Sequence, residues 1–214
     1  MEVEKQLLDI DSIIFDLDGT LWNASKTAAK AWNLALYDIG FSNIVVTEKN
    51  IRDFSGIPLG VLLETRFSNI PIDKRNEFIP VYAQYERAIM KEGGIIFPGV
   101  KETLETLADN RKLFIVSNCL EGYIENFLEY SKFSILFTGH KSSGRTGKTK
   151  SENIQLIIQE NCLKDSVYVG DTEFDQDACR EAGIPFVYAS YGFGKVEKPE
   201  YYIERFPDIL QLIE

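Results

Sequence analysis

The chain has 214 residues, of which 44% are hydrophobic and 26% are charged, and its formal net charge is −10. This composition is typical of a globular protein, and the length allows one domain with a sizeable core or a core domain with a small insertion. The negative charge disfavours binding to nucleic acid or to an anionic membrane surface, and no apolar run approaches the roughly 20 residues that span a bilayer.

Short apolar runs alternate with helical patterns along the chain, which is the signature of βαβ units and a parallel sheet. Most of these runs lead directly into polar residues. In open parallel sheets, ligands bind outside the carboxyl ends of the strands, so these polar residues are expected to meet in one crevice. The expected strands are residues 12–15, 112–116, 133–137, 166–169 and 184–188.

The stretch between the first two strands is far longer than one crossover helix requires, and it reads as almost wholly helical. Helices are expected over residues 24–37, 58–67 and 73–90, with Asp73 as the N-cap of the last and Gly93-Gly94 as a hinge. The predicted fold is therefore α/β, a Rossmann-like doubly wound parallel sheet with an inserted all-helical cap. Its core comprises residues 1–21 and 95–214, and its cap residues 22–94.

Two carboxylates lie directly after the first expected strand, in Asp16-Leu17-Asp18-Gly19-Thr20. Alternation along an extended segment would place both on the same side, beyond the strand end. Close carboxylates repel unless they share a positive charge, and Mg²⁺ with oxygen ligands suits a site that also binds phosphate. The alternative, a turn that ends a strand, explains Asp18-Gly19 alone, but a DxDGT sequence after an apolar strand is more specific.

A second acidic element, Gly170 to Asp175, follows another apolar strand. Asp171 stands at the strand end, where it could bind a metal ion. Asp175 lies about one helical turn later and could orient a metal-bound water or a neighbouring ligand. Alone, Asp171-Thr172 could equally be a helix N-cap, and the pairing with Asp16 and Asp18 favours the metal site.

Phosphate-binding candidates complete the set. Ser117-Asn118 follows the strand at 112–116, where a hydroxyl and backbone N–H groups can cradle phosphate oxygens. The segment from His140 to Lys150 holds four Lys or Arg and no acid, which suggests a local anion site. Lys150, at the start of a helix, could neutralise a phosphate group and keep a nearby carboxylate ionised.

On these residues the chain resembles the haloacid dehalogenase-like hydrolase superfamily. It is most similar to the branch that resembles phosphoglycolate phosphatases and β-phosphoglucomutases, whose helical cap lies between the first two motifs. Motif one corresponds to Asp16–Leu21, motif two to Ser117, motif three to a lysine and motif four to Gly170–Asp175. Together the four motifs span nearly the whole chain.

The resemblance implies a Mg²⁺-dependent phosphatase in which Asp16 attacks phosphorus and forms an aspartyl-phosphate. Asp18 would protonate the leaving oxygen and then deprotonate the attacking water. The metal ligands would be the Asp16 carboxylate, the Asp18 backbone carbonyl and Asp171, with Asp175 in support. Ser117 and Lys150 would bind the transferring phosphoryl group.

Two features depart from the family pattern or leave a choice open. Motif three could be Lys148 or Lys150, and we favour Lys150 because it lies at the better distance before the next strand. Many capped relatives carry Asp-Thr or Asp-Ser where this chain has Asn23-Ala24, and the hexose-phosphate mutases have a histidine where it has Ala28. Both absences weaken a mutase interpretation.

Four other functions were weighed. The segment Ser142–Thr149 resembles a Walker A loop but has Ser142 where that motif requires glycine. A dehalogenase would need neither Asp18 nor the acids of motif four. A phosphomutase keeps all four motifs, so that only the cap disfavours it, and a non-catalytic binding protein of the same fold stays an alternative.

The expected substrate is a small phosphorylated metabolite, and the cap residues Arg52, Phe54 and Arg66 could face it. The start of the chain, Met1 to Lys5, lacks the basic and apolar parts of a signal peptide. The three cysteines are widely spaced with no CxxC pair, which fits a reducing compartment. We therefore expect a cytoplasmic enzyme and make no prediction of its oligomeric state.

Overall fold

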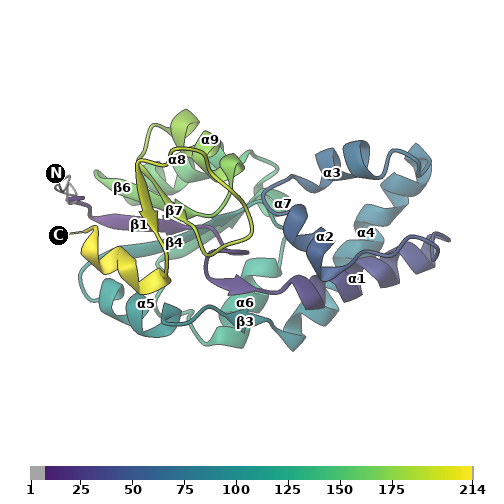
Figure 1. Ribbon diagram of the computed structural model, residues 1–214, viewed down its shortest axis with the longest axis horizontal. Coiled ribbons are helices and arrows are strands. Elements are labelled where there is room, and N and C mark those ends of the chain that lie inside the picture. Colours follow the sequence, from purple (N-terminus) through teal and green to yellow (C-terminus); the bar gives the residue numbers. More distant parts are fainter. Residues whose placement is uncertain (1–7, 214) are drawn as a thin grey trace.

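A six-stranded parallel sheet forms the centre of the larger part of the protein, in a computed structural model that describes residues 8–213 (Figure 1). The strand order is β5-β4-β1-β6-β7-β8, and every neighbouring pair is parallel. The strands are β1 (Ser12–Phe15), β4 (Lys112–Ser117), β5 (Gly139–Ser142), β6 (Ser166–Gly170), β7 (Phe186–Ala189) and β8 (Tyr201–Ile203).

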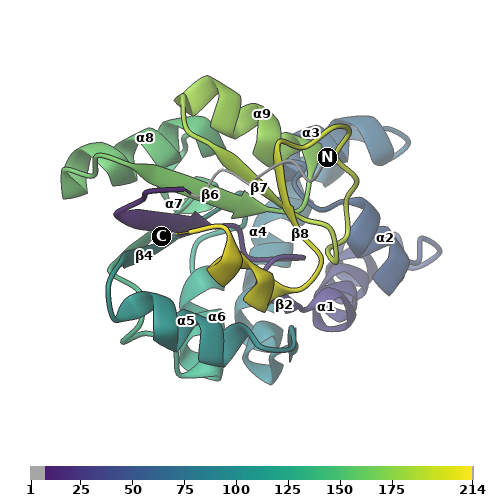
Figure 2. The ribbon, with the colours of Figure 1, turned by 60° about the vertical axis from the view of Figure 1, so that its left-hand side comes forward.

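Both faces of the sheet are covered, because successive side chains on each strand point to opposite faces. Ile13 and Phe15 of β1 pack into one hydrophobic cluster, whereas Ile14 packs into another. The first cluster lies under α5 (Val100–Ala108), α6 (Tyr123–Ser131) and the 3₁₀ helix η2 (Phe206–Gln211). The second lies under α8 (Lys150–Asn161) and α9 (Glu173–Ala182), on the opposite side (Figure 2). This three-layer arrangement confirms the predicted α/β doubly wound fold.

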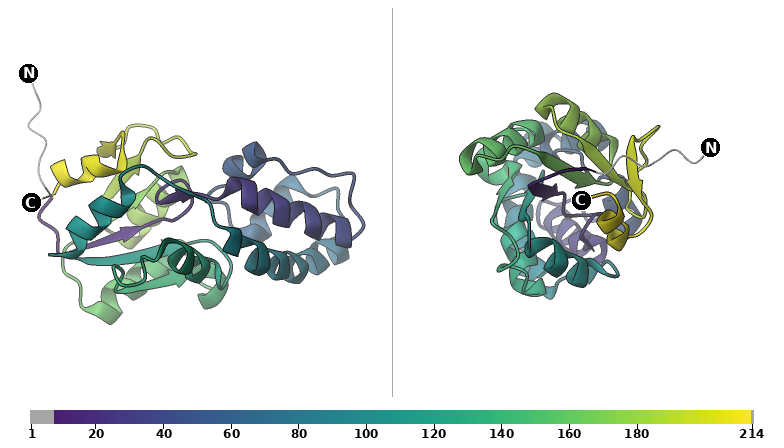
Figure 3. Two further views of the ribbon diagram at one scale, coloured as in Figure 1. Left: turned by 90° about the horizontal axis from the view of Figure 1, so that it is seen from below. Right: turned by 90° about the vertical axis from the view of Figure 1, so that its left-hand side faces the viewer.

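A separate helical lobe extends from one end of the sheet, away from the described chain ends Leu8 and Ile213, which form a β-bridge (Figures 1 and 3). Its own hydrophobic cluster is centred on Trp32, whose ring lies 4.7 Å from Phe78 and 5.1 Å from Tyr82. The lobe consists of α1 (Ser25–Asp38), α2 (Glu48–Asp53), α3 (Leu59–Arg66), α4 (Ile72–Ile89) and the 3₁₀ helix η1 (Met90–Glu92).

The chain enters and leaves this lobe through adjacent segments. Strand β2 (Trp22–Asn23) pairs antiparallel with β3 (Ile95–Ile96). Between them, Gly93 has a φ of 79°, and a Cβ atom there would lie 2.1 Å from the Tyr130 ring. Only glycine fits this crossing without strain. We propose residues 22–94 as the extent of the inserted lobe, because the two crossings meet here.

Several local predictions were wrong. Residues 133–137 form no strand; the strand lies at Gly139–Ser142, inside the segment expected to be a basic loop. The apolar residues before it pack from a loop, with Phe133 buried beside α6 while Ile135 is 91% exposed. Helix α4 begins after Pro71, so Asp73 lies in its first turn and is not its N-cap. Helix α2 was not predicted.

Two predictions concern location. Among the described residues, no helix combines the length and apolarity needed to cross a membrane. The start of the chain, from which the absence of a signal peptide was argued, lies outside the described residues. The cytoplasmic location stays a prediction.

The cluster around Trp32 is expected to hold the helical lobe together. Replacing the fully buried Phe78 by alanine should lower the free energy of unfolding by about 3–5 kcal/mol, because it leaves a cavity between aromatic rings. Urea unfolding followed by tryptophan fluorescence measures this. The control Tyr37→Ala removes a residue that is 67% exposed and should change the value by about 0.5 kcal/mol or less. Equal losses in the two variants would contradict this role.

Candidate active site

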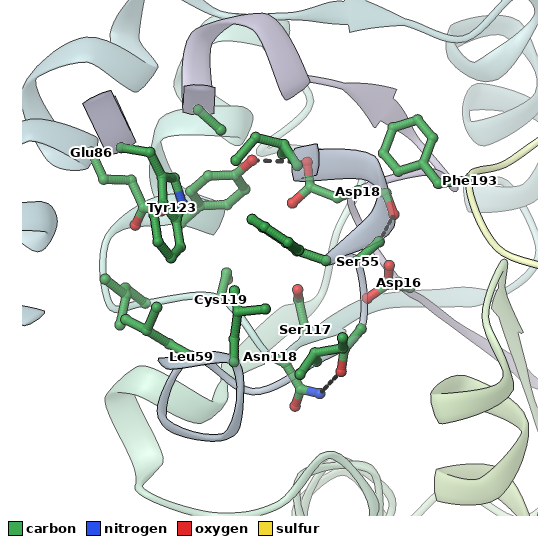
Figure 4. A pocket seen from close by; sticks show the side chains of 18 of the residues that line it. Asp16, Asp18, Ser55, Leu59, Glu86, Ser117, Asn118, Cys119, Tyr123 and Phe193 are labelled. Atoms are coloured by element: carbon green, nitrogen blue, oxygen red, sulfur yellow. Dashed lines mark hydrogen bonds between the residues drawn. The ribbon is translucent and has the colours of Figure 1, made fainter. Parts of the chain in front are cut away.

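Three neighbouring strands carry the predicted site residues at their carboxyl ends. Asp16 follows β1, Ser117 ends β4, and Asp171 follows β6, and β1 lies between the other two strands in the sheet. The backbone N–H of Asp16 donates to the Val169 carbonyl at 2.8 Å, which continues the sheet hydrogen bonding to the edge of the site. Sheet topology therefore brings together residues that are more than 150 positions apart in the sequence, and Figure 4 shows Asp16 and Ser117 beside the same pocket.

A buried lysine joins two of the carboxylates. The Nζ atom of Lys150 lies 2.8 Å from Asp16 Oδ1 and 2.5 Å from Asp175 Oδ1, and 5% of the residue is exposed. Burial opposes the charge on Lys150, but the two carboxylates outweigh it and raise the pKa of the lysine. Burial also raises the pKa of Asp16 to about 6, against the opposing effect of Lys150. The lysine therefore remains an ammonium group at neutral pH.

Asp175 is held by the first turn of α9. Its Oδ2 atom accepts hydrogen bonds from the Thr172 N–H at 3.0 Å, the Thr172 hydroxyl at 2.7 Å and the Asp171 N–H at 3.2 Å. Thr172 caps the helix in return, accepting from the Asp175 N–H. These bonds occupy Oδ2 and orient Oδ1 toward Lys150. The N-cap of α9 is thus Thr172, and Asp171 is left to face the site.

A cation-binding geometry results from this arrangement. Asp16, Asp171 and Asp175 each offer an oxygen atom, and these oxygens lie within 4.8 Å of one another. Asp171 Oδ2 accepts from the N–H groups of Phe193 and Gly194, whereas Asp171 Oδ1 is buried with no hydrogen-bond partner. Among the described residues nothing else occupies this oxygen, so it is available to coordinate a cation.

The charges of these carboxylates also favour a bound cation. Burial, Asp175 and Asp16 together raise the pKa of Asp171 well above its usual range. Only one ammonium group, that of Lys150, lies among the three buried carboxylates of the described site. An all-oxygen ligand set of carboxylates is what Mg²⁺ prefers, so the residues present fit this ion.

Glycine at position 19 lets the loop after β1 approach this cluster. Gly19 has a φ of 88°, and a Cβ atom there would lie 2.1 Å from Asp171 Oδ2. Any side chain would displace the Asp171 carboxylate, so both the positive φ and the close approach to Asp171 favour glycine at this fourth residue of the loop.

Asp18 points away from the carboxylate cluster. Its Oδ1 atom accepts a hydrogen bond from the Tyr123 hydroxyl at 2.8 Å. Burial raises the pKa of Asp18 to about 8, although the Tyr123 bond opposes this effect. Its backbone carbonyl accepts a 3.4 Å hydrogen bond from the Ser55 hydroxyl of the helical lobe. The Asp18 side chain is thus suited to carry a proton at neutral pH rather than to join the three-carboxylate cluster.

Ser117 and Asn118 lie beside the same pocket but are placed differently. Ser117 lines the pocket and is 5% exposed. The Asn118 side chain donates to the Gly56 carbonyl at 2.9 Å and accepts from the Ser143 hydroxyl at 2.9 Å. The Asn118 amide therefore ties the helical lobe to the core.

The two candidate lysines differ in burial and in their position relative to the pocket. Lys148 has an exposed side chain, lies 4.0 Å from Glu152, and does not line the pocket. The other basic residues of this segment pair with surface acids, Lys141 with Glu160 and Arg145 with Glu125. The local anion site expected from the whole segment is thus reduced to Lys150.

The pocket beside these groups has a volume of about 140 Å³ and is shared between the core and the helical lobe. Phe54 lines it as expected, whereas Arg52 and Arg66 do not. The sequence contains no signal for the rest of the pocket wall, because its members lie at ordinary helix or loop positions. Those not predicted include Trp32, Tyr82, Glu86, Cys119, Tyr123 and Phe193.

Comparison with known proteins agrees with this geometry. A profile of the family described as haloacid dehalogenase-like hydrolase matches residues 13–189. The phosphoglycolate phosphatase of Aquifex aeolicus is 27% identical, with 94% of this chain and 96% of the relative covered. The phosphoglycolate phosphatase of Salmonella typhimurium is 25% identical, over 96% of this chain and 93% of the relative.

A solved structure is similar to this one over nearly the whole of both chains, so the match includes the sheet and the helical lobe. The haloacid dehalogenase-like family hydrolase from Streptococcus pneumoniae is 26% identical, with a TM-score of 0.82, over 94% of this chain and 97% of that one. The family profile, the relatives and the fold all cover most of the chain. The protein therefore belongs to the haloacid dehalogenase-like hydrolase family.

Proposed function

We propose that the protein is a Mg²⁺-dependent phosphatase that hydrolyses small phosphate monoesters through an aspartyl-phosphate on Asp16. The observation that carries this proposal is the buried Asp16–Lys150–Asp175 chain beside the partnerless Asp171 oxygen. A lysine and a cation site flanking one carboxylate suit the attack of an anionic nucleophile on an anionic phosphate. The names of the phosphoglycolate phosphatase relatives support the same reaction class.

Asp16 is the proposed nucleophile. Lys150 holds Asp16 Oδ1 at 2.8 Å. One oxygen is thus oriented and the carboxylate can still form the new bond to phosphorus. The Ser117 hydroxyl and the backbone N–H groups after it would hold the phosphoryl oxygens.

Asp18 is the proposed acid and base. With a pKa of about 8 it holds a proton at neutral pH, which it would give to the leaving oxygen. The resulting carboxylate would then take a proton from the water that hydrolyses the aspartyl-phosphate, and Tyr123 would keep it in place throughout.

Asp16, Asp171, Asp175 and the Asp18 carbonyl are the proposed Mg²⁺ ligands, either directly or through water. When bound, Mg²⁺ would offset the carboxylate and phosphate charges and polarise the phosphoryl oxygens. Asp175 would support the metal site and also hold Lys150, because Lys150 and the N-terminus of α9 already contact its two oxygens.

Water is the favoured final acceptor. Ala28, at the position where a mutase would carry a histidine, lines the pocket and supplies no proton-transfer group for a second substrate hydroxyl. The filled positions of Asp18 and Asp171 disfavour both a dehalogenase and a non-catalytic binding protein, because neither needs them.

Substitution of the nucleophile tests the mechanism. Asp16→Asn should lower kcat for an aryl phosphate by about a thousandfold or more, because the amide cannot form the phosphoenzyme. Acid quenching during turnover, followed by mass spectrometry, should detect phosphate on Asp16 in the wild type. The control Asp53→Asn changes an exposed aspartate of α2 and should keep full activity. An active Asp16→Asn enzyme would exclude this nucleophile.

Metal binding can be measured without turnover. Mg²⁺ at a hundred times its dissociation constant should stabilise the fold by about 2.7 kcal/mol, a rise of several degrees in Tm. EDTA should reverse this rise, and Asp171→Asn should abolish it. The exposed Asp177→Asn on α9 should leave it intact. An unchanged Mg²⁺ response in Asp171→Asn would remove Asp171 from the ligand set.

The choice of lysine is tested by a matched pair. Lys150→Met should reduce kcat by about a hundredfold or more, because the phosphoryl charge and Asp16 lose their cation. Lys148→Met should stay within about twofold of wild type, since its exposed side chain lies outside the pocket. Circular dichroism checks that both variants fold. The reverse pattern would assign motif three to Lys148.

A further inference from the structure

A buried acid that the proposed reaction does not use forms part of the pocket wall. Glu86 of α4 is 6% exposed and accepts a hydrogen bond from the Tyr82 hydroxyl through Oε1. Among the described residues, no other group bonds to Glu86, so Oε2 has no partner. Figure 4 shows Glu86 on the opposite side of the pocket from Asp16, where the leaving group of a phosphate ester would extend.

The side chains of the helical lobe around Glu86 are mostly aromatic and aliphatic. Trp32 packs against Tyr82 at 5.1 Å and against Phe54 at 5.8 Å, which fixes the aromatic side of the pocket. A carboxylate in such a wall is stabilised by a donor that offsets its lost hydration. The apolar members of the wall include Ala28, Ile51, Ile57, Leu59 and Leu62.

No free positive charge faces the leaving group. Among the described residues that line the pocket, the acids are Asp16, Asp18 and Glu86, and Lys150 is the sole basic residue. Lys150 is already bound by two carboxylates. Arg52, the nearest expected cation, instead contacts Ser25 and Glu48. A leaving group with its own carboxylate would meet buried like charge, with no unpaired basic side chain among the described residues that line the pocket.

We propose that Glu86, held by Tyr82, selects phosphate monoesters whose small leaving group carries a hydroxyl or ammonium donor, and rejects acidic ones such as phosphoglycolate. This assignment rests on the proposed phosphatase function and deepens it. Glu86 is a specificity-determining residue that binds the far end of the leaving group. The pocket volume of about 140 Å³, against roughly 300–1,000 Å³ for drug-sized ligands, limits that group to a few heavy atoms.

The protonation state of Glu86 supports this assignment at mildly alkaline pH. Burial raises the pKa of Glu86 to about 7, although the Tyr82 hydroxyl opposes the shift. At pH 8 the side chain is therefore mostly a carboxylate, an acceptor that attracts donors and repels a second carboxylate. Assays at pH 8 therefore test Glu86 as a carboxylate. Asp18 is partly deprotonated at this pH, but it takes part in the same chemical step for every ester, so the ratio of two kcat/KM values removes its effect.

Four esters of similar size test the proposal with Mg²⁺ present. They are phosphoethanolamine, 2-hydroxyethyl phosphate, n-propyl phosphate and 2-phosphoglycolate, whose leaving groups are cationic, hydroxylated, apolar and acidic. At least one of the two donor-bearing esters should exceed both n-propyl phosphate and phosphoglycolate in kcat/KM by about tenfold or more, the value of one charged hydrogen bond. Which donor ester leads distinguishes ammonium from hydroxyl recognition.

A matched pair of variants assigns the preference to Glu86. Glu86→Gln should bring the ratio of the preferred ester to phosphoglycolate within about threefold, whereas Glu77→Gln, an exposed acid on the same helix, should keep the wild-type ratio. Calorimetric binding of the same esters to the Asp16→Asn protein should show the same order without turnover. If Glu86→Gln fails to fold, Tyr82→Phe should shift the ratio in the same direction, because it removes the hydrogen bond that positions Glu86 and keeps its pKa from rising further.

The outcomes separate the two proposals. Phosphoglycolate as the best ester, or an unchanged ratio in Glu86→Gln, would overturn the role of Glu86 and leave the phosphatase proposal standing. If neither these esters nor an aryl phosphate is hydrolysed with Mg²⁺, the phosphatase proposal fails, and the selection of substrates by Glu86 fails with it.

Discussion

The ion pairs of one buried lysine organise the site. Lys150, at the start of α8, contacts carboxylates that follow β1 and begin α9, so three separate segments converge on one ammonium group. Removing one partner from such a buried network costs about 3–5 kcal/mol, because the remaining charge has neither water nor a counter-ion. The carboxylate excess that Lys150 cannot offset makes the neighbouring space suited to a cation. The same buried charges thus hold the three segments together and form the proposed active site.

The sequence predicts the core of this arrangement well, for physical reasons. Alternating apolar strands that end in Asp16, Ser117 and Asp171 require those residues to meet, because parallel strands align their carboxyl ends. The apolar run at 133–137 was wrongly predicted to be a strand, because loop residues that pack against a helix can be as apolar as a buried strand. The choice between Lys148 and Lys150 depended on the start of α8, which the capping box of Thr149 and Glu152 sets. The pocket wall gave no signal, since Glu86 looks like any helix residue until Tyr82 and Trp32 surround it.

The helical lobe and the core line different parts of the pocket. The core supplies the charged half, and the lobe supplies most of the apolar half together with Glu86. Two polar contacts join these halves, Asn118 with the Gly56 carbonyl and Ser55 with the Asp18 carbonyl. Both use backbone atoms of one partner, so they fix the position of the lobe loop without constraining which side chains face the leaving group. Substrate selection can therefore change while the charged half stays constant.

The central position of β1 has a consequence for synthesis of the protein. Ser12 of β1 pairs with Ser166 of β6, 154 residues later, so the first strand to leave the ribosome must wait for its second neighbour. At roughly 5–20 residues per second, this wait is about 8–30 s. A bare Ile-Ile-Phe strand is prone to aggregate in that interval, and flanking charges are the usual protection. Asp9 and Asp11 before the strand, and Asp16 and Asp18 after it, provide such charges. The acids proposed to act on phosphate would thus first keep the nascent chain in solution.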